Sequence, residues 1–195
     1  MDKIRNIISA SVSVKQQLLQ DDLFLQQIAI ACNTITNAFK NGNKVLFCGN
    51  GGSAADAQHL AAEFSGRFYK NRQALPAEAL HCNTSYLTAV ANDYSFDEIY
   101  ARLVTGIGLS GDVLIGLSTS GNSPNIVRAF EAAREKGVIT MGFTGITGGA
   151  LKAWSDYLFN VPATDTPRIQ EAHILIGHII CQLVEEQLFG GEDTV

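Results

Sequence analysis

The amino-acid sequence predicts an α/β protein, folded as a three-layer α/β/α sandwich with a mainly parallel sheet and extra helices at the N-terminus. Short apolar runs alternate with helical stretches over most of the chain, and such strands pair in parallel with helices on both faces. The two clearest strands each lead through a glycine-rich or serine-rich turn into a helix. With 195 residues, we expect one domain over 1–195, with a core at about 44–189.

The first forty residues have helical periodicity. Ile4, Ile7 and Ile8 begin one apolar stripe, and Asp21 can cap a second helix. The apolar positions of the second helix are Leu25, Ile28, Cys32, Ile35 and Phe39. A domain of this size hardly needs two more apolar helices for its own core, so we expect helices at about 1–40 to pack against other subunits.

The rest of the chain alternates between the two element types. We expect strands at 44–48, 77–80, 113–117, 138–143 and 157–161. We expect helices at 54–64, 84–91, 95–107, 124–136 and 168–189, followed by a frayed polar tail of six residues. Ligands of parallel sheets bind at the carboxyl ends of the strands, which is where both polar turns fall.

Composition excludes several classes of function. The chain is 46% hydrophobic and 17% charged, so it can bury a core and is not disordered. Its net charge is −5, and Lys and Arg form no cluster, which argues against a nucleic-acid or membrane surface. No signal peptide or membrane-spanning run is recognisable. The four cysteines form no CxxC pair, so we expect reduced thiols and a cytoplasmic protein.

The strongest local signal is the serine turn, residues 118–123, between a strand and a helix. It carries four hydroxyl groups, from Ser118, Thr119, Ser120 and Ser123. Backbone N–H groups and the helix dipole at such a position favour a bound phosphate. The alternative is an ordinary turn in which Asn122 or Ser123 caps the helix. The strand–turn–helix context favours phosphate binding.

The glycine turn, residues 48–53, is a second signal at the same sheet edge. Gly49, Gly51 and Gly52 let the backbone approach a ligand closely. The turn matches neither GxGxxG nor GxxxxGK[ST], so it is not a nucleotide fingerprint. Taken alone, it is as well explained by a tight turn that only links a strand to a helix.

His59 and Glu63 are four residues apart on a predicted helix and therefore share one face. This spacing suits two ligands of one metal ion or an acid/base pair, although a surface His–Glu pair is the commoner explanation. Gln170 and His178 lie on the last helix, about 12 Å apart along its axis. They reach one ion only if their side chains converge or come from different subunits. Both also fit as satisfied core polar groups.

The Asn–Asp pair at residues 92–93 and two further histidines are weaker signals. Asn92 and Asp93 between two helices form either a turn or a site for sugar hydroxyls. His81 and His173 have no partner at metal-ligand spacing, so we expect them to be structural.

The motifs CGNGGSAADAQH, SGRF, ANDY, STSGNSPN and RIQEAHILIGHI occur in this order between about residues 22 and 189. In this combination the chain resembles the sugar isomerase (SIS) domain family, and within it the bacterial enzymes that act on heptose phosphates. The resemblance implies a Rossmann-like fold, a homotetramer with active sites at subunit interfaces, and one Zn²⁺ per subunit. It also implies conversion of sedoheptulose 7-phosphate to D-glycero-D-manno-heptose 7-phosphate, the first step towards ADP- or GDP-heptose for lipopolysaccharide core or capsule.

The resemblance also assigns roles to residues. The zinc ligands would be His59, Glu63, Gln170 and His178, and the catalytic pair would be Glu63 and His178. The residues implied to contact substrate are Asn50, Gly51, Gly52, Ser53, Glu63, Asn92, Asp93, Ser118, Thr119, Ser120, Ser123 and Gln170. A carboxylate suits the transfer of a proton between carbons through an enediol, and a histidine suits the proton transfers at the oxygens.

Three alternatives stay open. The first is a non-catalytic SIS tetramer that binds a replication initiator protein, which the presence of Glu63 and His178 disfavours. The second is a sugar-phosphate sensor, which normally carries a DNA-binding domain, whereas the N-terminal forty residues are too short and acidic for one. The third is an isomerase of another phosphosugar.

Overall fold

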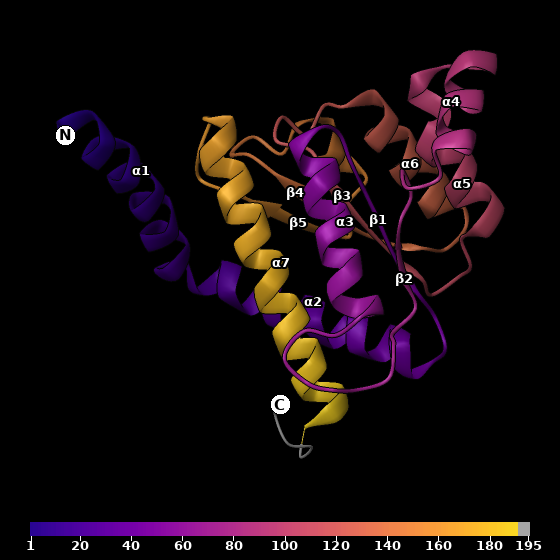
Figure 1. Ribbon diagram of the computed structural model, residues 1–195, viewed down its shortest axis with the longest axis horizontal. Coiled ribbons are helices and arrows are strands. Elements are labelled where there is room, and N and C mark those ends of the chain that lie inside the picture. Colours follow the sequence, from indigo (N-terminus) through magenta and orange to yellow (C-terminus); the bar gives the residue numbers. More distant parts are fainter. Residues whose placement is uncertain (191–195) are drawn as a thin grey trace.

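A five-stranded parallel sheet forms the centre of the computed structural model, which describes residues 1–190 (Figure 1). The strands are β1 (Val45–Gly49), β2 (Ala77–Ala79), β3 (Val113–Leu117), β4 (Ile139–Thr144) and β5 (Tyr157–Asn160). Their order across the sheet is β2-β1-β3-β4-β5, and all neighbouring pairs are parallel. The predicted parallel sheet is confirmed, and each expected strand is present with small shifts at its ends.

The helices also follow the sequence prediction closely. They are α1 (Asp2–Leu19), α2 (Asp22–Lys40), α3 (Gly52–Ser65), α4 (Thr84–Asp93), α5 (Ile99–Ile107), α6 (Pro124–Glu135) and α7 (Thr166–Phe189). The helix expected at 95–107 is divided into the 3-10 turn η1 (Phe96–Glu98) and α5, and a second 3-10 turn, η2 (Gly149–Ala153), was not expected. The predicted polar tail, apart from Gly190, lies outside the described residues.

Side chains alternate between the two faces of the sheet and build two cores. Val45 and Phe47 of β1 join the core beneath α2, α3 and α7. Leu46 and Cys48 join the core beneath α4, α5 and α6. Both faces are therefore covered, which explains why the strands read as continuous apolar runs. The predicted three-layer α/β/α sandwich is confirmed.

The two N-terminal helices differ in how they are packed. Asp21 caps α2 by accepting a hydrogen bond from the Phe24 N–H at 3.0 Å, and α2 packs against α7. Helix α1 extends away from the sheet at one side of the molecule (Figure 1). Ile4 and Ile8 on this helix are 59% and 58% exposed. One chain alone therefore leaves an apolar face of α1 uncovered.

The topology fixes where a ligand can bind. Strands β1 and β3 are neighbours, but the chain leaves β1 through α3 towards β2 and leaves β3 through α6 towards β4. The two connections therefore run in opposite directions across the sheet. In open parallel sheets the crevice outside the carboxyl ends of two such strands is the binding position. The glycine turn and the serine turn meet there.

The histidine and the cysteines that the sequence left without a partner take no part in this crevice. His173 is fully buried, its Nε2 lies 3.2 Å from the carbonyl oxygen of Thr144, and burial lowers its pKa to about 4. All four cysteines are free thiols, and burial raises the pKa of Cys32 to about 12. Within residues 1–190, no helix is long and apolar enough to cross a membrane.

Candidate functional site

The glycine turn after β1 is shaped by close contacts that exclude side chains. Gly51 adopts a φ of +57°, which glycine accommodates more easily than other residues. A Cβ atom on Gly49 would lie 2.4 Å from the carbonyl oxygen of Ser53, and one on Gly52 would lie 2.8 Å from Nε2 of Gln170. Both glycines therefore allow close packing of backbone, strand and helix, and the turn is more than a flexible link.

An amide pair joins the glycine turn to the helix that follows the serine turn. The Asn50 side chain donates to Oδ1 of Asn125 at 2.9 Å, and the Asn125 side chain donates back to Oδ1 of Asn50 at 2.8 Å. Asn125 is 1% exposed. The two turns are thus locked in one arrangement. Asn125 was not predicted, because an asparagine in the first turn of a helix is an ordinary residue there.

Two hydroxyls of the serine turn face each other and are not used to cap the helix, while Oγ of Ser120 accepts a hydrogen bond from the Asn122 N–H at 3.1 Å. Ser123 is the N-cap residue of α6, but its side chain makes no capping hydrogen bond. Its Oγ instead lies 2.9 Å from Oγ of Ser118. Asn122 accepts a hydrogen bond from the Ala150 N–H at 2.9 Å, far along the chain. The geometry therefore does not support the simple capping explanation and leaves hydroxyls available at a helix N-terminus.

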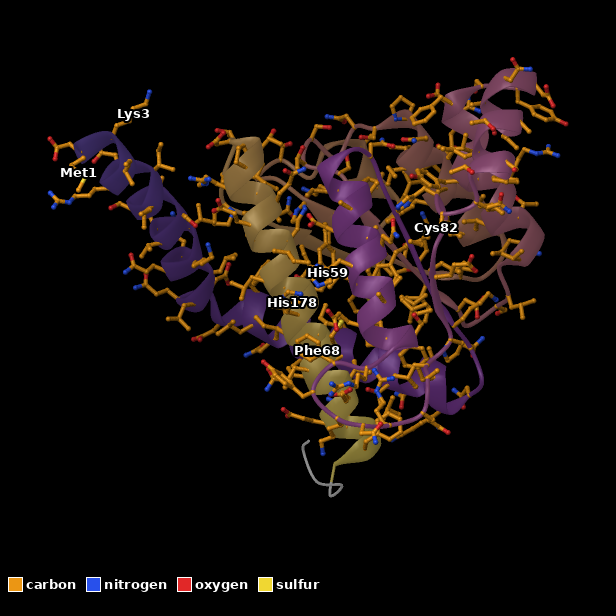
Figure 2. The ribbon with its side chains drawn as sticks, in the orientation of Figure 1. Met1, Lys3, His59, Phe68, Cys82 and His178 are labelled. Atoms are coloured by element: carbon orange, nitrogen blue, oxygen red, sulfur yellow. The ribbon has the colours of Figure 1, made fainter. Side chains whose placement is uncertain are left out.

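Helices α3 and α7 run side by side and carry the four predicted metal ligands (Figure 2). Gly177 makes the close approach possible, because a Cβ atom there would lie 2.5 Å from Cδ1 of Leu60. At the start of the pair, Nε2 of Gln170 lies 3.4 Å from Oγ of Ser53. About two helical turns further along, His59 of α3 faces His178 of α7.

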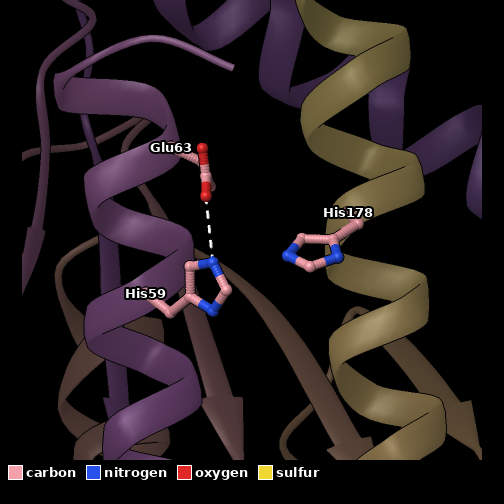
Figure 3. A group of neighbouring side chains, drawn as sticks. All are labelled: His59, Glu63 and His178. Atoms are coloured by element: carbon pink, nitrogen blue, oxygen red, sulfur yellow. Dashed lines mark hydrogen bonds and ion pairs between the residues drawn. The ribbon is translucent and has the colours of Figure 1, made fainter. Parts of the chain in front are cut away.

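His59, Glu63 and His178 form a compact group between these helices (Figure 3). Nε2 of His59 lies 2.9 Å from Oε1 of Glu63. One nitrogen or oxygen ligand atom from each residue can be chosen so that all three lie within 4.8 Å of one another. Nε2 of His178 is buried and has no hydrogen-bond partner among the described residues. Two imidazoles, one of them with a buried nitrogen that has no partner, and a carboxylate fit a metal ion such as Zn²⁺.

The electrostatics of the group favour the neutral imidazole that metals bind. Burial lowers the pKa of His178, and the neighbouring His59 lowers it further, while Glu63 and Asp56 act in the opposite direction. Burial raises the pKa of Asp56, which lies near both histidines. The side chains of His59 and Glu63 remain 48% and 21% exposed. The group is therefore accessible to a substrate or to a second chain.

The structure separates the other predicted residues into two places. Gln170 lies at the glycine turn, and in one chain it is about 12 Å along the helix axis from His178. Asn92 and Asp93 are exposed at the end of α4, where the Asn92 amide donates to Oδ1 of Asp93 at 2.9 Å. In the described part of the chain, this pair makes no hydrogen bond to any of the other predicted site residues. Their contacts with substrate stay predictions.

Sequence reasoning also missed Phe68, which covers His178. The two ring centroids are 5.7 Å apart with an interplanar angle of 36°. Phe68 lies in the loop after α3 and was recognised only as part of the SGRF motif. No spacing rule connects it to His178 on the last helix, because the contact depends on how that loop folds back.

Comparison with known proteins places these features in one family. A profile of the SIS domain matches residues 11–145. The phosphoheptose isomerase of Clostridium acetobutylicum is 53% identical over 183 residues, covering 94% of this chain and 93% of the relative. Phosphoheptose isomerase 2 of Campylobacter jejuni is 52% identical, covering 96% and 93%. The structure of the phosphoheptose isomerase from Neisseria gonorrhoeae matches with a TM-score of 0.89 at 40% identity, covering 95% and 98%.

Proposed function

Since this chain belongs to the SIS-domain family, and within it to the phosphoheptose isomerases, we propose that it converts sedoheptulose 7-phosphate to D-glycero-D-manno-heptose 7-phosphate. The observation that carries the proposal is the group of His59, Glu63 and His178, on helices that begin at the ligand edge of the sheet. The reaction would open the synthesis of ADP- or GDP-heptose for surface polysaccharides. Detection of the aldose product by NMR tests it directly.

The serine turn would bind the phosphate. Ser118, Thr119, Ser120 and Ser123 offer hydroxyls at the N-terminus of α6, where the helix dipole favours an anion. The glycine turn, with Asn50, Gly51, Gly52 and Ser53, would hold the adjoining part of the sugar, together with Gln170. Asn92 and Asp93 would bind hydroxyls from the end of α4.

The phosphate role predicts a defect in binding. The combined change Ser118→Ala and Ser120→Ala is expected to raise KM more than it lowers kcat, because the bonds to phosphate exist before the reaction. Each lost hydrogen bond to a charged group should cost about 1.5–3 kcal/mol, roughly 10- to 100-fold in affinity. Steady-state kinetics measure both constants. Ser110→Ala, a hydroxyl at the opposite edge of the sheet, serves as the control, and an unchanged KM in the double variant would contradict the assignment.

Glu63 and His178 would carry the proton transfers. The Glu63 carboxylate takes the proton from C1 of the open-chain ketose, and a C1–C2 double bond forms while O2 gains a proton. The enediol then loses the proton on O1, and Glu63 returns a proton to C2. His178 would exchange the protons on the oxygens. Because the carbon proton moves between adjacent carbons, one flexible carboxylate can serve both steps.

His59, Glu63 and His178 would hold one Zn²⁺ per subunit. A zinc ion bound there would act as a Lewis acid towards the carbonyl and hydroxyl oxygens of the sugar. We propose Gln170 as the fourth ligand, contributed by a second copy, because the Gln170 of the same chain lies at the glycine turn. A glutamine carbonyl is a weak ligand, so the ion is expected to exchange readily.

We propose a homotetramer with active sites at the subunit interfaces. The apolar face of α1, including Ile4 and Ile8, supports it, because exposed apolar surface on one face of a helix is typical of an interface.

The four free thiols support a cytoplasmic location. Nothing in the site points to nucleic acid or membrane.

The near full-length similarity to phosphoheptose isomerases favours the enzyme over a non-catalytic SIS tetramer or an isomerase of another phosphosugar.

Light scattering at micromolar concentration is expected to give the mass of four chains. The double change Ile4→Lys and Ile8→Lys should release smaller species, because buried apolar contacts would be replaced by charge repulsion. Asn6→Lys with Ser13→Lys places the same charges on the opposite side of α1 as a control. A wild-type monomer would contradict the tetramer and the interface-built active sites.

A further inference from the structure

The loop after α3 folds back over the last turns of α7 and is tied there by a buried ion pair. Nε of Arg72 lies 2.9 Å from Oε1 of Glu185, and the two side chains are only 1% and 2% exposed. We call this pair, with the groups that it binds, the Arg72–Glu185 clasp. Neither residue belongs to the predicted site, and both lie at the end of the helix pair that carries the proposed metal ligands.

Glu185 holds the loop through its backbone. Its carboxylate accepts hydrogen bonds from the N–H groups of Phe68 at 3.1 Å, Tyr69 at 2.8 Å and Lys70 at 2.9 Å. Burial acts to raise the pKa of Glu185, but these three bonds and Arg72 outweigh it, so the pKa lies below its usual range. The carboxylate is therefore ionised, and it fixes three successive residues of the loop.

Arg72 holds the end of α3. Its guanidinium donates to the carbonyl oxygens of Glu63 and Phe64, each at 2.8 Å, and of Gly66 at 3.0 Å. The last carbonyls of a helix have no partner within the helix, and a cation there also complements the helix dipole. The clasp thus connects the backbone of a proposed ligand, Glu63, to the helix that carries His178.

A second contact brings the clasp to His178 itself. The N–H of Phe68 is bound by Glu185, and its ring packs on the imidazole of His178 at a centroid distance of 5.7 Å. Glu185 lies about two turns beyond His178 on α7. One buried carboxylate therefore positions the ring that covers one proposed ligand and, through Arg72, the backbone of another.

We propose that Arg72 and Glu185 are positioning residues for the metal site, which set the spacing between α3 and α7 so that His59, Glu63 and His178 converge. A buried ion pair is poor evidence for stability alone, because desolvation offsets much of the attraction. We infer that this ion pair instead fixes the geometry of both ligand-bearing helices, through several charge-assisted hydrogen bonds. The inference rests on the metal site of the proposed function.

Metal affinity tests the clasp without substrate. Zn²⁺ or Co²⁺ binding is measured by chelator competition for wild type, Glu185→Gln and Arg72→Lys. Changes in groups that orient metal ligands typically weaken metal binding about 10- to 100-fold, and we expect this range for both variants. Metal-free Glu185→Gln should also lose hydrogen-exchange protection at the amides of Phe68, Tyr69 and Lys70.

Asp112→Asn is the matched control, because Asp112 is a fully buried carboxylate bound to Lys44 at 2.5 Å, just before β3, and is not part of the clasp. It should lower stability and leave metal affinity unchanged. Wild-type metal affinity in folded Glu185→Gln and Arg72→Lys would overturn the inference. If Glu185→Gln fails to fold, Arg72→Lys, which keeps the charge, decides alone. A wild-type chain that binds no metal would overturn the metal site itself, and the clasp role with it.

Discussion

Replacing Glu63 by glutamine is expected to lower turnover by about 10²–10⁴-fold, the usual contribution of general-base catalysis, while the phosphosugar still binds. Glutamine keeps the shape of the side chain and an oxygen that can bind a metal, but it cannot accept the proton from C1. The Glu63 side chain is 21% exposed, so its carboxylate is accessible to a sugar bound at a subunit interface.

Turnover, substrate affinity and metal content should be measured on the same Glu63→Gln samples, because Glu63 is also a proposed ligand. Glu186→Gln makes the same chemical change on an exposed part of α7 and serves as the control. The double variant Glu63→Gln with His178→Gln should lose less turnover than the product of the two single losses, because both groups serve one proton-transfer sequence. Most of the wild-type turnover in Glu63→Gln with its metal in place would show that Glu63 is a ligand or structural residue only.

Removing both imidazoles, by His59→Ala with His178→Ala, is expected to abolish zinc binding and turnover together. Protein purified without chelator should contain about one zinc per chain, as a complete four-ligand site would hold. The double variant should contain almost none, since the carboxylate of Glu63 and the weak carbonyl ligand of Gln170 are too few to retain the ion. Elemental analysis measures the content directly.

His81→Gln removes a histidine outside the group and should keep the zinc. Thermal unfolding adds a second measurement, because a ligand that binds only the folded state stabilises it by about 2.7 kcal/mol at 100 times its Kd. Chelator should therefore lower the Tm of wild type and leave the Tm of the double variant unchanged. Zinc retained by the double variant would place the ion elsewhere.

The sequence predicted the elements of the fold well because both faces of the sheet are covered. A strand such as Val113–Leu117 is buried on both sides and is therefore apolar throughout, which makes its ends visible in the sequence. The order of the strands could not be predicted in the same way. It depends on which face each connecting helix covers, and helices on both faces show similar apolar stripes.

The candidate site was predictable where its residues share an element. His59 and Glu63 lie one turn apart on α3, so their spacing alone indicated a pair. The approach of His178 depends on Leu60 packing against Gly177, a contact that no local pattern reveals. Arg72 and Glu185 were missed for a related reason. In sequence they look like ordinary surface charges, and only the fold shows that both are buried.

We propose that this chain isomerises a heptose phosphate through an enediol. The most direct measurement follows sedoheptulose 7-phosphate by NMR in D₂O after addition of the protein. We expect D-glycero-D-manno-heptose 7-phosphate with solvent deuterium at C2, and no such product with Glu63→Gln on the same timescale. Substrate that stays unchanged would contradict the isomerase function, and product without deuterium at C2 would contradict proton transfer through a solvent-exchanging base.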